Sequence, residues 1–383
     1  MEASEANFII LRLRHLRINL ESLDKKLGHL LVKAQVAGQV QREDLNTAQI
    51  TIRKSLSQVL PLFYPLAGRY NKEKHSVDCN DEGAEFSVAE VDCSLHQLIG
   101  AEVKSEQINH LLPAEIGATD EPTDPMLAVQ INRFQCGGLA IGICASHRIF
   151  DSCSVGIFLK AWANASTDGG LVICPDFDSP SYFPSENMAP LQYEGRSSFC
   201  STNPGFCVTG QNTGVESLAE AINVRERTVP PVGKYACGAC FSISYLDFSP
   251  NQSHEMEQNY LGMVLKMREA TVQGVKDCAR ILSDKEFGKW VLVDSYFDAA
   301  QKASGPDYKV IWVTDWSKFG EYELDYGFGK PVWVSLADVP LRDLIILMNT
   351  KDNDGIEAWV YLYESDMAYF ERDEDLRMLT KQS

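Results

Sequence analysis

Two neighbouring apolar segments carry the clearest hydrophobic pattern in the chain. They are LAVQINRF (127–134) and LAIGICASH (139–147), and they flank Gln135-Cys-Gly-Gly138, whose paired glycines suit a tight turn. Both faces of the second segment are apolar until its end, where His147 stands. The pattern predicts an antiparallel hairpin whose second strand is central and buried.

The hydrophobic period changes from strand to helix just after Asp151. Apolar side chains then recur at helical spacing and form one core face: Val155, Phe158, Leu159 and Trp162. Asp151 or Ser152 stands where the N-cap of such a helix belongs. His147 therefore lies at a strand–turn–helix junction, where a side chain can leave the core and enter a cleft.

The remainder of the first half contains shorter patterns. Apolar residues between 45 and 60 recur at helical spacing, which predicts a helix that ends at Pro61. Residues 76–91 alternate on either side of Asn80-Asp-Glu-Gly83, which predicts a second hairpin. Residues 166–215 are rich in Gly, Pro, Ser and Asp and have little period, so we expect a crossover between two domains.

The second half combines strands with long helices. We expect a helical region from about 253 to 300 with a break near 282–284, a hairpin that turns at Asp352-Asn-Asp-Gly355, and a last helix capped by Ser365 or Asp366. The expected strands lie within 239–248, 308–316, 325–336, 343–350 and 356–363. These patterns predict an α/β protein with an N-terminal domain (1–165), a crossover (166–215) and a C-terminal domain (216–383).

Composition and charge narrow the possible functions. The chain has 383 residues, 45% of them hydrophobic, and a formal charge of −18, which disfavours binding to nucleic acid or to an anionic membrane surface. No window approaches the roughly 20 apolar residues of a membrane span. The 11 irregularly spaced cysteines are typical of free thiols in a reducing compartment, so we expect a cytoplasmic protein. We also expect a monomer. Cys237-Gly-Ala-Cys240, a single CxxC pair, is weak support for zinc or redox chemistry.

His147 and Asp151 allow two readings. In the simpler one, a strand-end histidine bonds to backbone beside an aspartate that only caps a helix. In the other, His147 is a general base of near-neutral pKa, the role that suits this side chain. Ser146 points to the opposite face of the strand and is not its nucleophile. Two residues are too few for a metal site, so we expect no metal.

The segment Asp325-Tyr-Gly-Phe-Gly-Lys-Pro331 also stands out. The simpler reading is a glycine-rich turn that enters a strand. Two glycines around an aromatic residue also allow another backbone or a flat cofactor to approach closely.

Several motifs occur in a fixed order and together resemble the plant BAHD acyltransferases. They are YPLAGR (64–69), HxxxD (147–151), NVRER (223–227) and DYGFGKP (325–331). The resemblance extends to SVDCNDEGAEF (76–86), CGGLAIGICASHRIFD (136–151), FDSPSYFP (177–184), GKPVWVS (329–335) and TKDNDGIEAWVYLYESDMAYFE (350–371). The resemblance covers most of the chain from about residue 55 to 371. The motif sequences are most similar to those of the branch that acetylates hydroxyls of alkaloids and terpenoids.

The resemblance implies a fold, a reaction and a role for each motif. The family fold consists of two α/β domains with mixed sheets, similar to chloramphenicol acetyltransferase, with an active-site channel at their interface. It implies transfer of an acyl group from acyl-CoA, most simply acetyl-CoA, to the hydroxyl of a small-molecule alcohol.

The family's site residues transfer to seven positions in three segments of this chain. His147 would be the general base, and Asp151 would keep its loop in shape, typically through an arginine. Thr314 and Trp316 would stabilise the oxyanion or bind substrate. Asp325, Gly327 and Gly329 would support the CoA side structurally.

The sequence also departs from the family pattern. The family motif D-F-G-W-G has Tyr326 and Phe328 at its aromatic positions here, and Asp315 stands where a neutral residue is more usual. The chain is several tens of residues shorter than family members, and GVESLAEAINVRER (214–227) looks like two family segments fused. The alternative hypothesis is therefore a catalytically impaired member that only binds a metabolite or a partner.

Overall fold

The computed structural model describes most of the chain. The described ranges are 31–37, 42–99, 108–114, 123–182, 215–248, 260–304 and 308–376, apart from residues 72, 75, 168, 169, 286, 338, 340 and 375. Residues 1–30 and most of the expected crossover lie outside these ranges.

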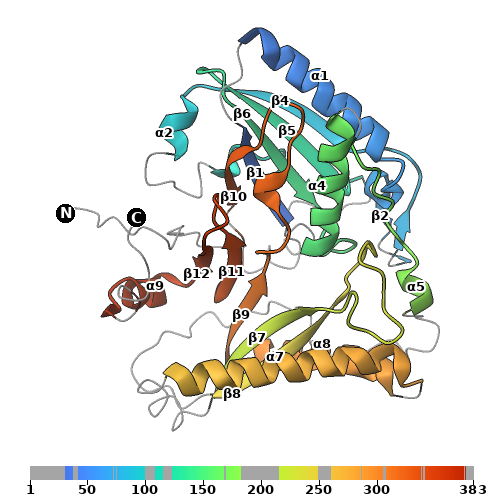
Figure 1. Ribbon diagram of the computed structural model, residues 1–383, viewed down its shortest axis with the longest axis vertical. Helices are drawn as coiled ribbons and strands as arrows, with labels where there is room; N and C mark the ends of the chain where they lie inside the picture. Colours follow the sequence, from blue (N-terminus) through green and yellow to red (C-terminus); the bar gives the residue numbers. More distant parts are fainter. Residues whose placement is uncertain are drawn as a thin grey trace.

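Two five-stranded sheets organise the molecule (Figure 1). In the first sheet the strand order is β10 (Pro331–Leu336), β1 (Leu31–Ala37), β6 (Leu139–Ala145), β5 (Leu127–Phe134) and β4 (Glu85–Val91). In the second sheet it is β12 (Ile356–Tyr361), β11 (Leu344–Asn349), β9 (Tyr308–Asp315), β7 (Val215–Asn223) and β8 (Phe241–Phe248). Both sheets contain parallel and antiparallel pairs, which confirms the expected mixed α/β architecture.

The helices form layers on the two sheets. α1 (Arg42–Val59) packs beside α4 (Ser152–Ser166) over the first sheet, and α7 (Tyr260–Ser283) and α8 (Gly288–Ser304) cover the second sheet at β8 (Figure 1). α1 ends just before Pro61, as the sequence predicts. The break between α7 and α8 is also confirmed. The shorter helices are α2 (Leu95–Ile99), α5 (Ser179–Tyr182), α9 (Glu364–Phe370), η2 (Tyr64–Ala67) and η3 (Glu321–Glu323). None of the helices in the described ranges is long and apolar enough to span a bilayer.

The predicted hairpin at the centre of the first sheet is confirmed. β5 and β6 pair antiparallel, and the Phe134 amide closes the turn by donating to the Gly138 carbonyl at 2.9 Å. β6 lies in the middle of the sheet, and all seven of its residues are buried. The hairpin at β11 and β12 is confirmed as well.

Two local predictions are wrong. Residues 76–91 do not form a hairpin, because β3 (Ser76–Asp78) pairs with β2 (Arg69–Asn71) and β4 runs parallel to β5. The Gly83 amide in the expected turn instead donates to the Ala67 carbonyl. α9 starts after Tyr363 and has no side-chain cap, since Asp366 bonds to Lys309 Nζ at 2.5 Å instead.

The sheets do not follow the order of the chain. β10 comes from the C-terminal half but pairs with β1 in the first sheet. The domain boundaries at 165 and 216 stay a prediction. Because β10 lies in the first sheet, the C-terminal half of the chain contributes strands to both sheets.

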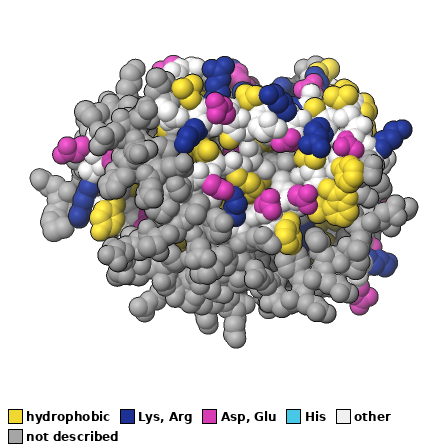
Figure 2. All heavy atoms as spheres, turned by 90° about the horizontal axis from the view of Figure 1, so that it is seen from below, with side chains coloured by type: hydrophobic (Ala, Val, Ile, Leu, Met, Phe, Trp, Pro, Cys, Tyr) yellow, Lys and Arg dark blue, Asp and Glu magenta, His cyan; other side chains and the backbone are white. Residues whose placement is uncertain are grey.

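The outer face of α7 and α8 is chemically mixed. Exposed apolar side chains such as Val264, Leu265 and Trp290 lie on these helices, and Phe287 is exposed in the connection between them. Figure 2 shows that hydrophobic side chains on the face seen from below are scattered among charged side chains of both signs. On the described part of this face, apolar and charged side chains are therefore interspersed, and isolated exposed apolar side chains do not by themselves mark an interface.

Candidate active site

His147 follows the central strand β6 in a tight turn. The Ile149 and Phe150 amides both donate to the Ser146 carbonyl, which reverses the chain immediately after the strand. Phe150 is fully buried and anchors the turn in the core. The histidine is therefore held between a buried strand and a buried anchor.

The environment of His147 favours a neutral imidazole. Burial lowers the pKa of His147 below its ordinary value of 6.5, and a hydrogen bond to its own backbone and the charge of Asp151 raise it by less. Protein atoms surround the ring closely enough for this effect, although the residue keeps an intermediate solvent exposure. A neutral imidazole at neutral pH is the form that can accept a proton.

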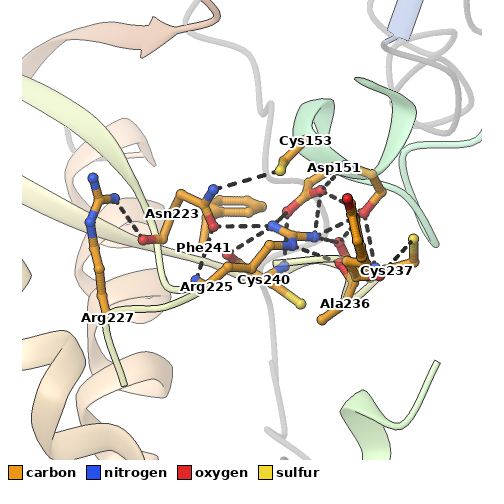
Figure 3. Close-up of polar contacts among 12 residues, drawn as sticks. Asp151, Cys153, Asn223, Arg225, Arg227, Ala236, Cys237, Cys240 and Phe241 are labelled. Carbon is orange, nitrogen blue, oxygen red and sulfur yellow. Dashed lines mark hydrogen bonds and ion pairs between the residues drawn. The ribbon is translucent and has the colours of Figure 1, made fainter. Parts of the chain in front are cut away.

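Asp151 caps α4, as the sequence predicts, but the cap is only part of its role. Oδ1 accepts from the Ser154 amide (2.8 Å), the Ser154 hydroxyl (2.7 Å) and Arg225 Nη2 (3.0 Å). Oδ2 accepts from Arg225 Nη1 (2.8 Å) and the Cys240 amide (3.0 Å). The carboxylate is thus saturated with donors (Figure 3).

Arg225 is the partner that the family resemblance implies for Asp151. Its side chain is 2% exposed and that of Asp151 is 8%, so the ion pair is removed from water. Burial lowers the pKa of Arg225, but the charge and hydrogen bonds of Asp151 raise it by more, so the guanidinium stays charged. Nε donates to the Ala236 carbonyl at 2.7 Å, and Nη1 also reaches Asn223 Oδ1 at 3.2 Å.

The loop that contains Cys237-Gly-Ala-Cys240 surrounds this ion pair with backbone groups. The Gly238 carbonyl accepts from the Asp151 amide at 3.3 Å, and Gly238 has a φ of +149°, a conformation that favours glycine. Burial raises the pKa of Cys237 to about 12 and that of Cys240 to about 11, so both thiols are protonated. Among the described residues, no group of three His, Cys, Asp or Glu side chains could hold a metal ion.

Two further motifs meet at the same place. The Asp176 amide donates to the Tyr235 carbonyl, and the Cys237 amide donates to the Asp176 carbonyl, which fixes the start of the FDSP segment against the CGAC loop. Phe177 then packs against Phe63 and Phe150, with ring centroids 6.3 and 6.1 Å apart. Phe150, in the turn after His147, therefore packs against both Phe63, which precedes YPLAGR, and Phe177 of the FDSP segment.

Thr314 and Trp316 lie at the C-terminal end of β9. Trp316 is buried, and its indole Nε1 donates to Thr314 Oγ1 at 3.1 Å. Because this bond uses Thr314 Oγ1 as the acceptor, the hydroxyl keeps its own proton to donate. Asp315 alternates with Thr314 along the strand and is exposed, where its carboxylate accepts from the Ser317 amide.

Phe319 connects this segment to the helix of the HxxxD motif. Its ring is tilted against Trp316 with centroids 6.3 Å apart. On the other side it faces Gly156 of α4, where a methyl group would lie 3.5 Å from Phe319 Cβ. The proposed base and the proposed oxyanion donor thus lie on segments that are joined through one intervening side chain.

The Asp325 motif packs on the far end of α4. Asp325 Oδ1 accepts from the amides of Gly327 (2.8 Å) and Gly329 (2.9 Å), both of which have positive φ. A Cβ at Gly327 would lie 3.1 Å from the Ser166 carbonyl at the end of the helix. Tyr326 packs edge-on against Trp162 at 5.1 Å, so an aromatic residue still fills the position that departs from the family motif.

The predicted site residues therefore form three groups along α4. His147 and Asp151 lie at its start, and Asp325, Gly327 and Gly329 lie near its end; Thr314 and Trp316 connect through Phe319 to its middle. Sequence reasoning missed Ser154, Gly238 and the specific arginine. The NVRER motif contained the signal for Arg225, but only the fold selects it over Arg227, which is exposed and bonds to the Asn223 carbonyl.

Comparison with known proteins identifies the family. The sequence matches the Transferase family over residues 12–202 and 208–377. It is 33% identical over 371 residues to pelargonidin 3-O-(6-caffeoylglucoside) 5-O-(6-O-malonylglucoside) 4'''-malonyltransferase of Salvia splendens, which covers 85% of this chain and 87% of the relative. It is 30% identical to vinorine synthase of Rauvolfia serpentina, over 85% of this chain and 84% of the relative.

Solved structures show the same fold. The crystal structure of vinorine synthase matches with a TM-score of 0.73 and 23% identity, and the match covers 99% of this chain and 98% of that one. F. sporotrichioides TRI101 complexed with coenzyme A and T-2 matches with a TM-score of 0.63 at 14% identity, over 94% and 98% of the two chains. The chain belongs to the Transferase family. Within it, the protein is an acyltransferase of the BAHD type.

Replacement of Arg225 by methionine tests the buried ion pair. The Arg225→Met variant leaves the Asp151 carboxylate buried without its cation, so we expect the free energy of unfolding to fall by about 3–5 kcal/mol. Arg280→Met is the matched control, because the Arg280 side chain is 56% exposed and lies 3.8 Å from the carboxylates of Asp277 and Asp284. This variant should lower the free energy of unfolding by less than about 1 kcal/mol. Equal losses in urea unfolding of the two variants would contradict a special role for Arg225.

Proposed function

We propose that this acyltransferase moves an acetyl group from acetyl-CoA to a hydroxyl of a plant specialised metabolite, with His147 as the general base. The position of His147 carries the proposal. It is deep enough for burial to lower its pKa, yet it remains partly accessible to solvent. A side chain with both properties lines an internal passage better than it fills a sealed core, which supports the expected channel.

The proposed reaction begins with proton transfer to His147. The imidazole accepts the hydroxyl proton of the acceptor while the alcohol oxygen attacks the thioester carbonyl. The carbon–sulfur bond then breaks, and the imidazolium returns the proton to the departing CoA thiolate, so the products are an ester and free CoA. General-base assistance of this kind contributes roughly 10²–10⁴-fold, and alignment of the two substrates contributes further.

We propose Nε2 as the ring nitrogen that acts as the base, since His147 also bonds to its own backbone. Chain geometry allows Nδ1, the nitrogen next to Cγ, to reach the residue's own carbonyl. A proton held on Nδ1 leaves the Nε2 lone pair free to face the acceptor hydroxyl.

We propose Thr314 as the oxyanion donor, with Trp316 orienting it. The indole of Trp316 donates to Thr314 Oγ1, and this contact leaves the hydroxyl proton directed elsewhere. Negative charge develops on the carbonyl oxygen in the tetrahedral intermediate, where a preorganised donor has its largest effect. The exposed Asp315 carboxylate accepts from the Ser317 amide.

The Asp325 motif is proposed as structural support for the CoA side. Asp325 binds the amides of Gly327 and Gly329, and the loop rests on α1 and the end of α4. It acts by fixing the helix that the HxxxD aspartate caps, without touching the reacting atoms. A metal plays no part in the proposed reaction.

The relatives support the substrate classes. Two of their names describe acyl transfer, a malonyltransferase of Salvia splendens and the stemmadenine O-acetyltransferase of Catharanthus roseus, and TRI101 was solved in complex with coenzyme A. The nine cysteines in the described ranges are all free thiols. Free thiols are typical of a reducing compartment, which supports the proposal of a cytoplasmic enzyme. A monomeric state remains the expectation.

Replacement of His147 tests the proposed base. We expect His147→Ala to lower kcat by about 10²–10⁴-fold, because no other group would accept the hydroxyl proton. The assay follows free thiol released from acetyl-CoA or malonyl-CoA with a panel of alkaloid and terpenoid alcohols. His96→Ala, an exposed histidine on α2, is the control. Full activity of His147→Ala would refute the proposal; saturable CoA binding without turnover in the unmodified protein would favour a catalytically impaired binding protein.

Replacement of Thr314 separates binding from catalysis. Thr314→Val removes the hydroxyl at nearly constant volume, and we expect kcat to fall by about 10²–10³-fold with little change in KM. Thr314→Ser keeps the donor and should retain most of the activity. A rise in KM with unchanged kcat would show that Thr314 only contributes to substrate binding.

The pH dependence follows from the lowered pKa of His147. The base must be neutral, so kcat/KM falls as the pH drops through the pKa of the folded enzyme and is constant above it. Because burial lowers that pKa, the midpoint should lie below 6.5. A midpoint above pH 7 in stopped-time assays with a non-ionisable alcohol would contradict this assignment.

A further inference from the structure

Ser154 occupies an unusual position in the first turn of α4. Its side chain is fully buried, and its hydroxyl lies within hydrogen-bond distance of four groups. It is 2.7 Å from Asp151 Oδ1 and 2.9 Å from Arg225 Nη2. It is also 3.0 Å from the Gly238 amide and 3.1 Å from the Gly238 carbonyl.

These contacts use the full hydrogen-bonding capacity of a hydroxyl group. A serine hydroxyl has one proton to donate and two lone pairs. The lone pairs accept from Arg225 Nη2 and the Gly238 amide. The proton is directed at the nearer acceptor, Asp151 Oδ1, with the Gly238 carbonyl as the alternative. No polar contact of Ser154 is left over for substrate.

The hydroxyl joins three segments that are far apart in the sequence. Asp151 belongs to the HxxxD turn, Arg225 follows β7, and Gly238 lies in the CGAC loop. The Asp151 amide also donates to the Gly238 carbonyl, so Ser154 and Gly238 together hold both the side chain and the backbone of Asp151. Asp151 is four residues from His147, and the turn between them is closed by bonds to the Ser146 carbonyl.

We propose that Ser154 is a positioning residue for the acyl-transfer reaction, whose hydroxyl locks the HxxxD turn to the CGAC loop and so sets where His147 meets the acceptor. The inference rests on the proposed function but assigns a role to a residue outside the motif. It also accounts for the CGAC sequence, whose backbone, rather than its thiols, serves the site.

Ser154→Ala tests this role against that of an ordinary buried serine. The variant keeps the Asp151–Arg225 ion pair but leaves Arg225 Nη2 and the Gly238 amide each without one acceptor. We expect kcat to fall about tenfold, while KM for acyl-CoA and for the alcohol changes less than twofold, because Ser154 contacts neither. The lowered midpoint of the pH profile should move upward as the loosened turn admits water to His147.

Ser55→Ala is the matched control. Ser55 of α1 is also buried, and its hydroxyl makes three contacts, with the Ile52 carbonyl (3.0 Å), Trp162 Nε1 (3.0 Å) and Ser166 Oγ (2.7 Å). It should lower the melting temperature by a similar amount and leave kcat and the pH midpoint of the folded fraction unchanged. If Ser154→Ala yields no folded protein, Ser154→Cys, with a weaker donor of similar size, should shift the same quantities less.

A measurement without substrate keeps this test separate from that of the proposed function. The imidazole resonance of His147, assigned by its loss in His147→Ala, is titrated by NMR in the unmodified protein and in Ser154→Ala. The proposal predicts a higher His147 pKa in Ser154→Ala and no change in Ser55→Ala. An unchanged titration together with unchanged kcat would overturn the positioning role, even if His147 proves to be the base. Absence of any acyl transfer would refute the proposed function alone, since the titration would still decide the role of Ser154.

Discussion

A carboxylate and a guanidinium that are both shielded from water hold the two halves of this protein together. Asp151 and Arg225 are separated by 74 residues, and each would be costly to bury without the other. Every remaining donor or acceptor of the pair is met by backbone or by a neighbouring side chain. The pair therefore specifies one arrangement of the HxxxD turn, the end of β7 and the CGAC loop.

α4 connects this ion pair to the other predicted site residues. Asp151 fixes its first turn, Gly156 in its middle faces Phe319, and its last turn lies under Gly327 and beside Tyr326. Phe319, Gly327 and Tyr326, which meet the middle and the end of the helix, all come from the C-terminal half of the chain. Because β10 also crosses into the first sheet, the position of His147 depends on both halves being folded.

The sequence predicts those structural features that are determined by residues close together in the chain. The central strand ending at His147 and the helix beginning after Asp151 follow from hydrophobic period and cap chemistry alone. The partner of Asp151 does not, because an ion pair across 74 residues leaves no local pattern. The error at Asn80-Asp-Glu-Gly83 has the same cause: local turn chemistry suggests a hairpin, but the Gly83 amide has a distant partner in Ala67, and β4 pairs with β5 instead of β3. The CxxC spacing of Cys237 and Cys240 suggests a role for the thiols, but it is the peptide groups of Gly238 and Cys240 that bond to Asp151 and Ser154.

Native-state hydrogen exchange tests the central claim most directly. The amides of Ser154 and Cys240 donate to Asp151, and that of Gly238 donates to Ser154, so all three should be protected by the same interaction. The account predicts that they exchange only through global unfolding, with one common free energy that changes with denaturant at the slope of the whole protein. Fast exchange of Gly238 and Cys240 through local opening, while β6 stays protected, would show that the two halves are not held together by this ion pair.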